Sequence, residues 1–120
     1  MNETKFSVYN YKGCTVSCSK ERWETHIAQH HKIMDNNIAA VKDTIKDPDS
    51  VYESTEYPNR EVYFKSSTFS SYKDFKTKVI VEYSPGVKNP DTVVGSVVTT
   101  FPVKGETGGI GNAVYKKSSD

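Results

Sequence analysis

Three histidines, which are all the histidines of the chain, lie at positions 26–31 in the segment WETHIAQHHK. Imidazole is the side chain whose unperturbed pKa lies closest to neutral pH, and it is also a common metal ligand. His26, His30 and His31 are therefore candidates for proton transfer, for metal binding or for packing. Which role applies depends on where the neighbouring elements place each ring.

The three rings occupy different positions on the helix that this segment predicts. At about 100° per residue, His30 falls inside the apolar stripe that begins at Trp23, whereas His26 and His31 fall at its two edges. A histidine on an apolar face usually packs through a hydrogen bond, so His30 is expected to pack and His31 to be exposed. His26 is the strongest candidate for acid or base chemistry.

Two metal patterns are possible around these rings. The segment HIAQH has the spacing of the metalloprotease motif H-E-x-x-H, but Ile27 replaces the glutamate that acts as general base, which argues against that reaction. A zinc site built from Cys14, Cys18, His26 and His30 offers four ligands of the right type. Cys14 and Cys18 share a strand face, which favours core packing of both thiols. The zinc-stabilised domain is kept as an alternative.

The elements that position these residues follow from periodicity. Alternation predicts a β-hairpin in the first 18 residues, and helical spacing predicts two helices. Ser19 is the expected N-cap of the first helix. Pro48 is expected to end the second helix, because the residue before a proline disfavours helical backbone angles. KVIVEY, the most hydrophobic of the strand segments that follow, is expected at the centre of a sheet.

Helices followed by strands predict an α+β fold. We expect an N-terminal β-hairpin and two helices packed on one face of a four- to five-stranded antiparallel sheet. The 120 residues fit a single domain over 1–120, with a hairpin extension at 1–18, helices at 19–47 and the sheet at 49–117.

Charge and composition restrict the classes of function. Sixteen Lys and Arg against fifteen Asp and Glu give a formal charge of +1, which argues against a protein that grips long duplex DNA through many phosphates. No apolar run reaches the length of a membrane span, and the first residues lack a secretory signal, so we expect no membrane partner and a cytoplasmic protein. Two cysteines are too few for a disulfide scaffold.

Several segments together resemble a known family. HIAQHH, IKDPDSVYES, REVYFK, KVIVEY and VVTTFPV, in this order, resemble the phage-associated branch of the barnase/EndoU/colicin-nuclease/RelE-like (BECR) ribonuclease superfamily. The resemblance extends from Trp23 to Tyr115. It implies N-terminal helices on an antiparallel sheet and cleavage of RNA without a metal or other cofactor, in an enzyme of the hydrolase class. The ribose 2′-OH would attack the adjacent phosphate and leave a 2′,3′-cyclic phosphate.

The resemblance also implies partners and site residues. RNA, tRNA included, would be the substrate of a phage-borne or toxin-type effector domain, and an antidote protein or a larger parent protein would be its partner. The implied catalytic residues are His26 as acid or base, Arg60 and Lys65 as phosphate-binding cations, Thr99 or Thr100 as a strand hydroxyl, and Tyr115. The candidate substrate-binding residues are His30, His31 and Tyr63.

Strand alternation limits which of these residues can act together. Regular pairing places Arg60 and Lys65 on opposite faces of one strand, and it separates Thr99 from Thr100 in the same way. The chain also departs from the family pattern at His31, where a proline is expected. An alternative from another functional class is a non-catalytic RNA- or protein-binding module on the same fold, which the near-zero charge and the eight tyrosines favour.

Overall fold

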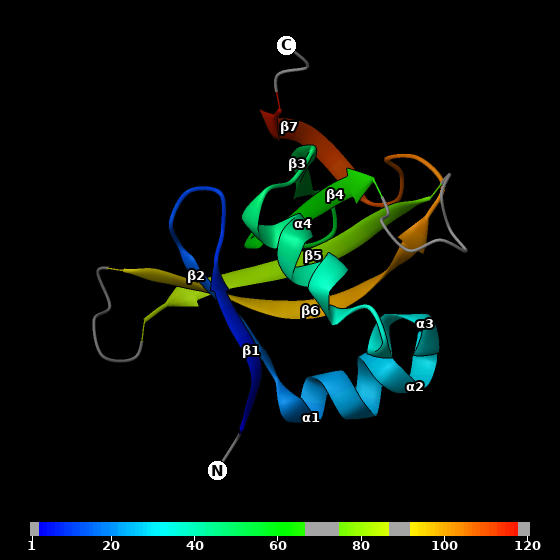
Figure 1. The fold of residues 1–120 in the computed structure, drawn as a ribbon. Coiled ribbons are helices and arrows are strands. Elements are labelled where there is room, and N and C mark those ends of the chain that lie inside the picture. Colours follow the sequence, from blue (N-terminus) through cyan, green and yellow to red (C-terminus); the bar gives the residue numbers. More distant parts are fainter. Residues whose placement is uncertain (1–2, 67–74, 87–91, 118–120) are drawn as a thin grey trace.

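The computed structural model describes residues 3–66, 75–86 and 92–117 of the chain. The strands in these ranges are β1 (Thr4–Tyr9), β2 (Thr15–Ser19), β3 (Ser50–Ser54), β4 (Arg60–Ser66), β5 (Lys76–Pro85), β6 (Val93–Val103) and β7 (Ile110–Lys116). Together these seven form one sheet in the order β1-β2-β6-β5-β4-β3-β7 (Figure 1). All neighbouring strands with a recorded register are antiparallel except β2 and β6, which are parallel.

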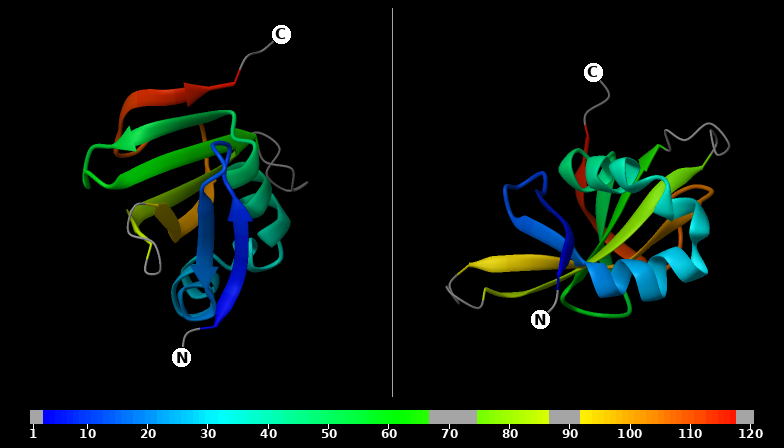
Figure 2. Two further views of the ribbon diagram at one scale, coloured as in Figure 1. Left: turned by 90° about the vertical axis from the view of Figure 1, so that its left-hand side faces the viewer. Right: turned by 60° about the horizontal axis from the view of Figure 1, so that its bottom comes forward.

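The α+β class is confirmed, whereas the expected four- to five-stranded antiparallel sheet is wrong. The hairpin β1–β2 is part of the sheet and not an extension, because Val16 pairs with Gly95 and Ser17 with Ser96. The glycine permits this approach: a Cβ at Gly95 would lie 2.8 Å from Val81 Cγ1 and 3.0 Å from Val16 Cγ2. Figure 2 shows the hairpin running across the direction of β5 and β6.

The helical segments are α1 (Lys20–Arg22), a π-helical turn η1 (Trp23–Ile27), α2 (Ala28–His30), α3 (Lys32–Asp35) and α4 (Ile38–Lys46). The first predicted helix is therefore interrupted. Ser19 caps it as expected, since its Oγ accepts a hydrogen bond of 3.0 Å from the Arg22 backbone N–H. None of the helices in the described ranges is long and apolar enough to cross a membrane.

The π-helical turn changes the direction in which the histidines point. A π turn contains more residues than an α turn, so side chains that follow it are rotated relative to a regular helix. His31 has non-helical backbone angles (φ −137°, ψ 68°) and ends α2. His30 is exposed, and His31 is half-buried and stacked on Phe101, with ring centroids 4.9 Å apart. The expected packing of His30 and exposure of His31 are therefore both wrong.

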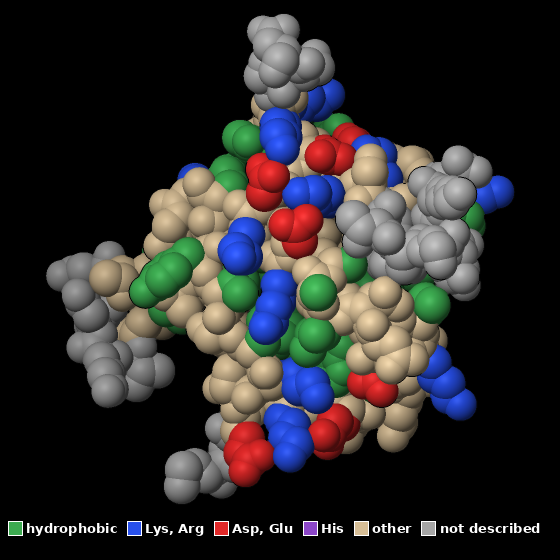
Figure 3. All heavy atoms as spheres, viewed as in Figure 1, with side chains coloured by type: hydrophobic (Ala, Val, Ile, Leu, Met, Phe, Trp, Pro, Cys, Tyr) green, Lys and Arg blue, Asp and Glu red, His purple; other side chains and the backbone are tan. Residues whose placement is uncertain are grey.

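Helix α4 lies over β4 and β5 and ends as predicted before Pro48 (Figure 1). Asp47 has non-helical backbone angles (φ −144°, ψ 68°), in agreement with the bias against helical angles at a residue that precedes a proline. Lys65 of β4 joins the helix to the sheet through ion pairs with Asp43 (3.0 Å) and Asp47 (3.2 Å). Basic and acidic side chains are interleaved over this face of the molecule (Figure 3).

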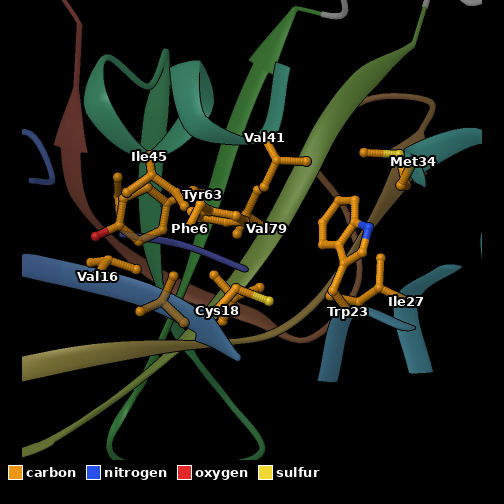
Figure 4. Packing of buried hydrophobic residues seen from close by; sticks show 13 residues of the cluster. Phe6, Val16, Cys18, Trp23, Ile27, Met34, Val41, Ile45, Tyr63 and Val79 are labelled. Atoms are coloured by element: carbon orange, nitrogen blue, oxygen red, sulfur yellow. The ribbon is translucent and has the colours of Figure 1, made fainter. Parts of the chain in front are cut away.

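One hydrophobic core lies between the helices and the sheet (Figure 4). Helix α4 contributes Val41 and Ile45, and the segment before it contributes Trp23, Ile27 and Met34, all without exposed surface. The sheet contributes Phe6, Val16, Cys18, Val51, Tyr63, Val79, Val81 and Val97. As the sequence predicts, β5 is the fourth of seven strands and therefore central.

Candidate functional site

Two adjoining hollows lie where the chain passes from β2 into α1. The first has a volume of about 270 Å³ and is lined by residues of β2, β4, β5 and β6 as well as α1. The second, of about 420 Å³, lies along α1 and η1. Ser19 and Arg22 line both hollows. The two hollows therefore adjoin each other at these two residues.

The first hollow combines cations, carboxylates and hydroxyl groups. Its polar side chains include Glu3, Ser17, Arg22, Arg60, Glu82 and Ser96. Two guanidinium groups and two carboxylates thus line the hollow, and their formal charges sum to zero. Guanidinium and hydroxyl donors are the groups that bind phosphate oxygens most often in proteins. The arrangement can hold an anion that replaces one of the carboxylates as partner of an arginine.

Arg60 begins β4 and is held on two sides. Its Nε donates to Glu82 Oε1 at 3.0 Å, and its guanidinium carbon lies 3.9 Å from the centroid of the Tyr57 ring. The strand register pairs Arg60 with Glu82 directly across β4 and β5. Among the described residues the ion pair uses only Nε, so both Nη groups can bind a ligand there.

His26 lines the second hollow, together with Ser19, Glu21, Arg22 and Thr25. It is partly exposed, in the π-helical turn, and its ring centroid lies 5.4 Å from that of His30. His26 and Arg60, both named as candidate catalytic residues from the sequence, therefore line adjoining hollows that share Arg22.

His31 has a different environment from the two other histidines. It is half-buried against Phe101 and lines neither hollow. Burial lowers its pKa, and the nearby His26 and His30 lower it further. The geometry supports a packing role for the His31 ring, against an aromatic side chain.

Lys65 lies away from these hollows. It is five residues beyond Arg60 on β4, which corresponds to about 17 Å along a strand. Burial lowers the pKa of Lys65, but hydrogen bonds to Asp43 and Asp47 outweigh that effect and raise it. The structure does not bring Lys65 together with Arg60, and its charge is already neutralised by two carboxylates.

The two threonines predicted to supply a hydroxyl line neither hollow. Thr100 is fully buried, and its Oγ1 donates to the Lys78 carbonyl at 2.8 Å. Thr99 pairs with Ile80, and its Oγ1 is buried without a hydrogen-bond partner among the described residues. The hydroxyl group that β6 contributes to the first hollow belongs to Ser96.

Tyr63 and Tyr115 are packing residues. Tyr63 has no exposed surface, so the expectation that it binds substrate is wrong. Its hydroxyl accepts a hydrogen bond of 3.0 Å from Asn10 Nδ2 and is also bonded to the Tyr83 hydroxyl. Tyr115 of β7 lies 4.5 Å from Tyr11, centroid to centroid. Neither tyrosine lines the two hollows.

The zinc alternative is wrong for the described residues, which include all four of its proposed ligands. No group of three or more potential metal ligands is found in this part of the chain. Cys18 is 1% exposed and belongs to the hydrophobic core, where burial raises its pKa to about 11. Cys14 Sγ instead donates to the Val93 carbonyl at 3.0 Å.

Sequence reasoning missed Arg22, Ser17 and Ser96. Each is an ordinary polar residue in a strand or a first helical turn, and no local pattern distinguishes it from a solvated one. The pairing of β2 with β6, which brings Ser17 beside Ser96, joins segments far apart in the chain.

Comparisons with known protein families, with curated proteins and with solved structures found no match.

Proposed function

We propose that the protein is a metal-independent endoribonuclease that holds a backbone phosphate of RNA between Arg22 and Arg60 and uses His26 for proton transfer. The observation that supports this function best is that His26 and Arg60 line hollows that share Arg22. A phosphate in the first hollow accepts hydrogen bonds from the Nη groups of Arg60, from Arg22 and from the Ser96 hydroxyl.

The proposed reaction needs two proton transfers. The ribose 2′-OH loses a proton and attacks phosphorus, the bond from phosphorus to the 5′-oxygen breaks, and that oxygen gains a proton. The products are a 2′,3′-cyclic phosphate and a free 5′-hydroxyl. His26 carries out one transfer, and a carboxylate of the first hollow, Glu3 or Glu82, carries out the other. The arginines stabilise the charge that develops on the phosphate oxygens.

The test is incubation of tRNA or total RNA with the protein in the presence of EDTA. Cleavage is expected to leave 2′,3′-cyclic phosphate ends. His26→Ala is expected to lower the rate by about 100-fold or more, as for the loss of a general acid or base. Arg22→Gln and Arg60→Gln are each expected to lower it by about tenfold or more.

Lys32→Gln is the matched control. Lys32 is an exposed cation of the same N-terminal helical region, and it lines neither hollow, so its removal is expected to leave the rate unchanged. RNA that remains intact with the folded parent protein contradicts the proposal. RNA that is bound but not cut, with the same affinity after His26→Ala, identifies a non-catalytic binding module.

A further inference from the structure

Lys78 is a buried lysine that the proposed ribonuclease reaction does not use. It lies on β5, paired with Phe101 of β6, and only 6% of its surface is exposed. Its Nζ lies 5.5 Å from the centroid of the Phe101 ring and 5.8 Å from that of Phe64. A buried ammonium group is costly unless other groups compensate its charge, so its partners indicate what the site can bind.

Two backbone carbonyls hold this ammonium group. Nζ donates to the carbonyls of Thr107 and Gly108, each at 2.9 Å. A lysine ammonium has three hydrogens, so one of them is left without a hydrogen-bond acceptor in the part of the chain that the structure describes. No carboxylate in that part forms an ion pair with Lys78.

The loop approaches Nζ so closely because residue 108 is a glycine. Gly108 has a positive φ of 88°, and a Cβ there would lie 2.7 Å from Lys78 Nζ. Burial lowers the pKa of Lys78, whereas the negative charge of Glu56 acts in the opposite direction. The charge of Lys78 is thus only partly compensated within the described residues.

Lys78 lines a hollow of about 270 Å³ with mostly apolar walls. Val62, Ile80 and Phe101 form these walls, and the carboxylate of Glu56 stands beside Gly109 at the same hollow. Apolar walls with a single buried cation suit a ligand that has an apolar body and one negative charge. Glu56 repels negative charge on a ligand at short distance, so a ligand with one negative charge is favoured over a ligand with two.

We propose that this hollow binds a small monocarboxylate. Its apolar body contacts Val62, Ile80 and Phe101, and its carboxylate accepts a hydrogen bond from the third N–H of Lys78 Nζ. The proposal does not depend on ribonuclease activity, because its evidence comes from Lys78 and the walls around it.

Benzoate, benzyl alcohol and benzylamine form a matched set of probes with the same ring and different charge. We expect benzoate to bind the full-length protein with a dissociation constant of about 1 mM or tighter, and benzyl alcohol at least about tenfold more weakly. Two-dimensional ¹H–¹⁵N NMR titration reads out the site, with the largest shifts expected at the amides of Lys78, Gly108 and Gly109. Benzylamine is expected not to shift these amides.

Variants separate charge recognition from folding. Lys78→Met is expected to weaken benzoate binding at least about tenfold, provided that the NMR spectrum shows that the variant is folded. Glu56→Gln leaves Lys78 in place and is expected to keep or tighten benzoate binding, which provides a test even if Lys78→Met does not fold. Arg60→Gln, in the other hollow, is expected to leave the affinity for benzoate unchanged.

Four results overturn the proposal. Two concern the parent protein: benzoate binds no more tightly than benzyl alcohol, or the amide shifts map to the Arg22–Arg60 hollow. Two concern folded variants: Glu56→Gln binds benzoate more weakly, or Lys78→Met binds it with full affinity.

Discussion

One buried asparagine holds the turn of the N-terminal hairpin and joins that turn to the sheet. Asn10 is 5% exposed, and its Oδ1 accepts hydrogen bonds from the backbone N–H groups of Lys12 (2.9 Å) and Cys14 (2.8 Å). Its Nδ2 donates to the hydroxyl of Tyr63 at 3.0 Å. Side-chain amides of this kind commonly fix tight turns. Tyr63 is therefore a link between the hairpin and the centre of the sheet.

Removal of the Tyr63 hydroxyl is expected to lower the free energy of unfolding at neutral pH. Tyr63→Phe removes the hydrogen bonds of this hydroxyl with Asn10 Nδ2 and with Tyr83, and the loss of such a hydrogen bond costs about 1 kcal/mol each. Urea denaturation of the variant and the parent protein measures this difference. Tyr9→Phe is the control, because Tyr9 is 69% exposed and its hydroxyl is expected to contribute little.

The ionisation of Tyr63 predicts that the free energy of unfolding decreases at alkaline pH. Burial raises the pKa of Tyr63 from 10.0 to about 12, although hydrogen bonds with Tyr83 and Asn10 lower it in part. Below pH 10 the phenol is neutral in both states, so its full contribution is present. As the pH rises to about 12, the unfolded chain releases the proton first, and this contribution is lost. The alkaline decline in stability should be shallower in Tyr63→Phe than in the parent protein, and an equal decline contradicts this assignment.

Single residues differ in how well the sequence predicts them. Ser19 is predicted as an N-cap because its role depends only on the next few residues, and it caps α1. Arg22 lines both hollows without being predicted, because its function depends on strands that the local sequence does not identify. His31 stacks on Phe101 of a distant strand, which periodicity within one helix cannot indicate.

At the scale of elements, charged side chains fasten the end of α4 to two strands. Asp47 accepts hydrogen bonds from Lys65 of β4 at 3.2 Å and from Lys117, just beyond β7, at 2.9 Å. Hydrogen bonds from Lys117 and then from Lys65 lower the pKa of Asp47 below its usual 3.8. The Asp47 side chain is half exposed, so solvent and salt screen these contacts.

Asp47→Asn is expected to reduce stability slightly at low ionic strength, and the difference should shrink in high salt. Exposed ion pairs contribute at most about 1 kcal/mol each. Because the folded-state pKa of Asp47 is lowered, its contribution is present above pH 3.8 and is lost as the pH falls through the folded-state value. Urea denaturation at two salt concentrations and across this pH range measures both effects. A salt-independent difference contradicts the electrostatic explanation.

Elements whose apolar residues recur with a clear period are predicted well. Features that depend on pairing between strands far apart in the chain are not. The stripe of Ile38, Val41 and Ile45 predicts α4, and the apolar run of β5 predicts a central strand. The π-helical turn has no such signal, because one additional residue per turn leaves the apolar spacing nearly unchanged over five residues. The inclusion of the hairpin in the sheet was not predicted either, since alternation shows that a strand forms and not which strand it pairs with.

At the scale of the whole molecule, the hairpin joins the sheet at a point where side chains of the neighbouring strands crowd around Gly95. Gly95→Ala is expected to cost about 1–3 kcal/mol, the usual range for overpacking, because its Cβ would lie 2.8 Å from Val81 Cγ1 and 3.0 Å from Val16 Cγ2. Gly111→Ala is the matched control. Gly111 lies on the mostly exposed strand β7, and a Cβ there would have its nearest contact, the Thr55 methyl group, at 3.3 Å. Thermal and urea denaturation measure both variants, and equal losses contradict the crowding argument.

The parallel contact between β2 and β6 also determines an order of events during synthesis. Val16 and Gly95 pair although they are 79 positions apart in the chain. At about 5–20 residues per second, a ribosome needs about 4–16 s to make the intervening segment. During that time the hairpin can close on itself, but Val16 and Cys18 lack the strand and the core that later bury them. The nascent chain should therefore be most susceptible to chaperone binding and to aggregation before β6 emerges.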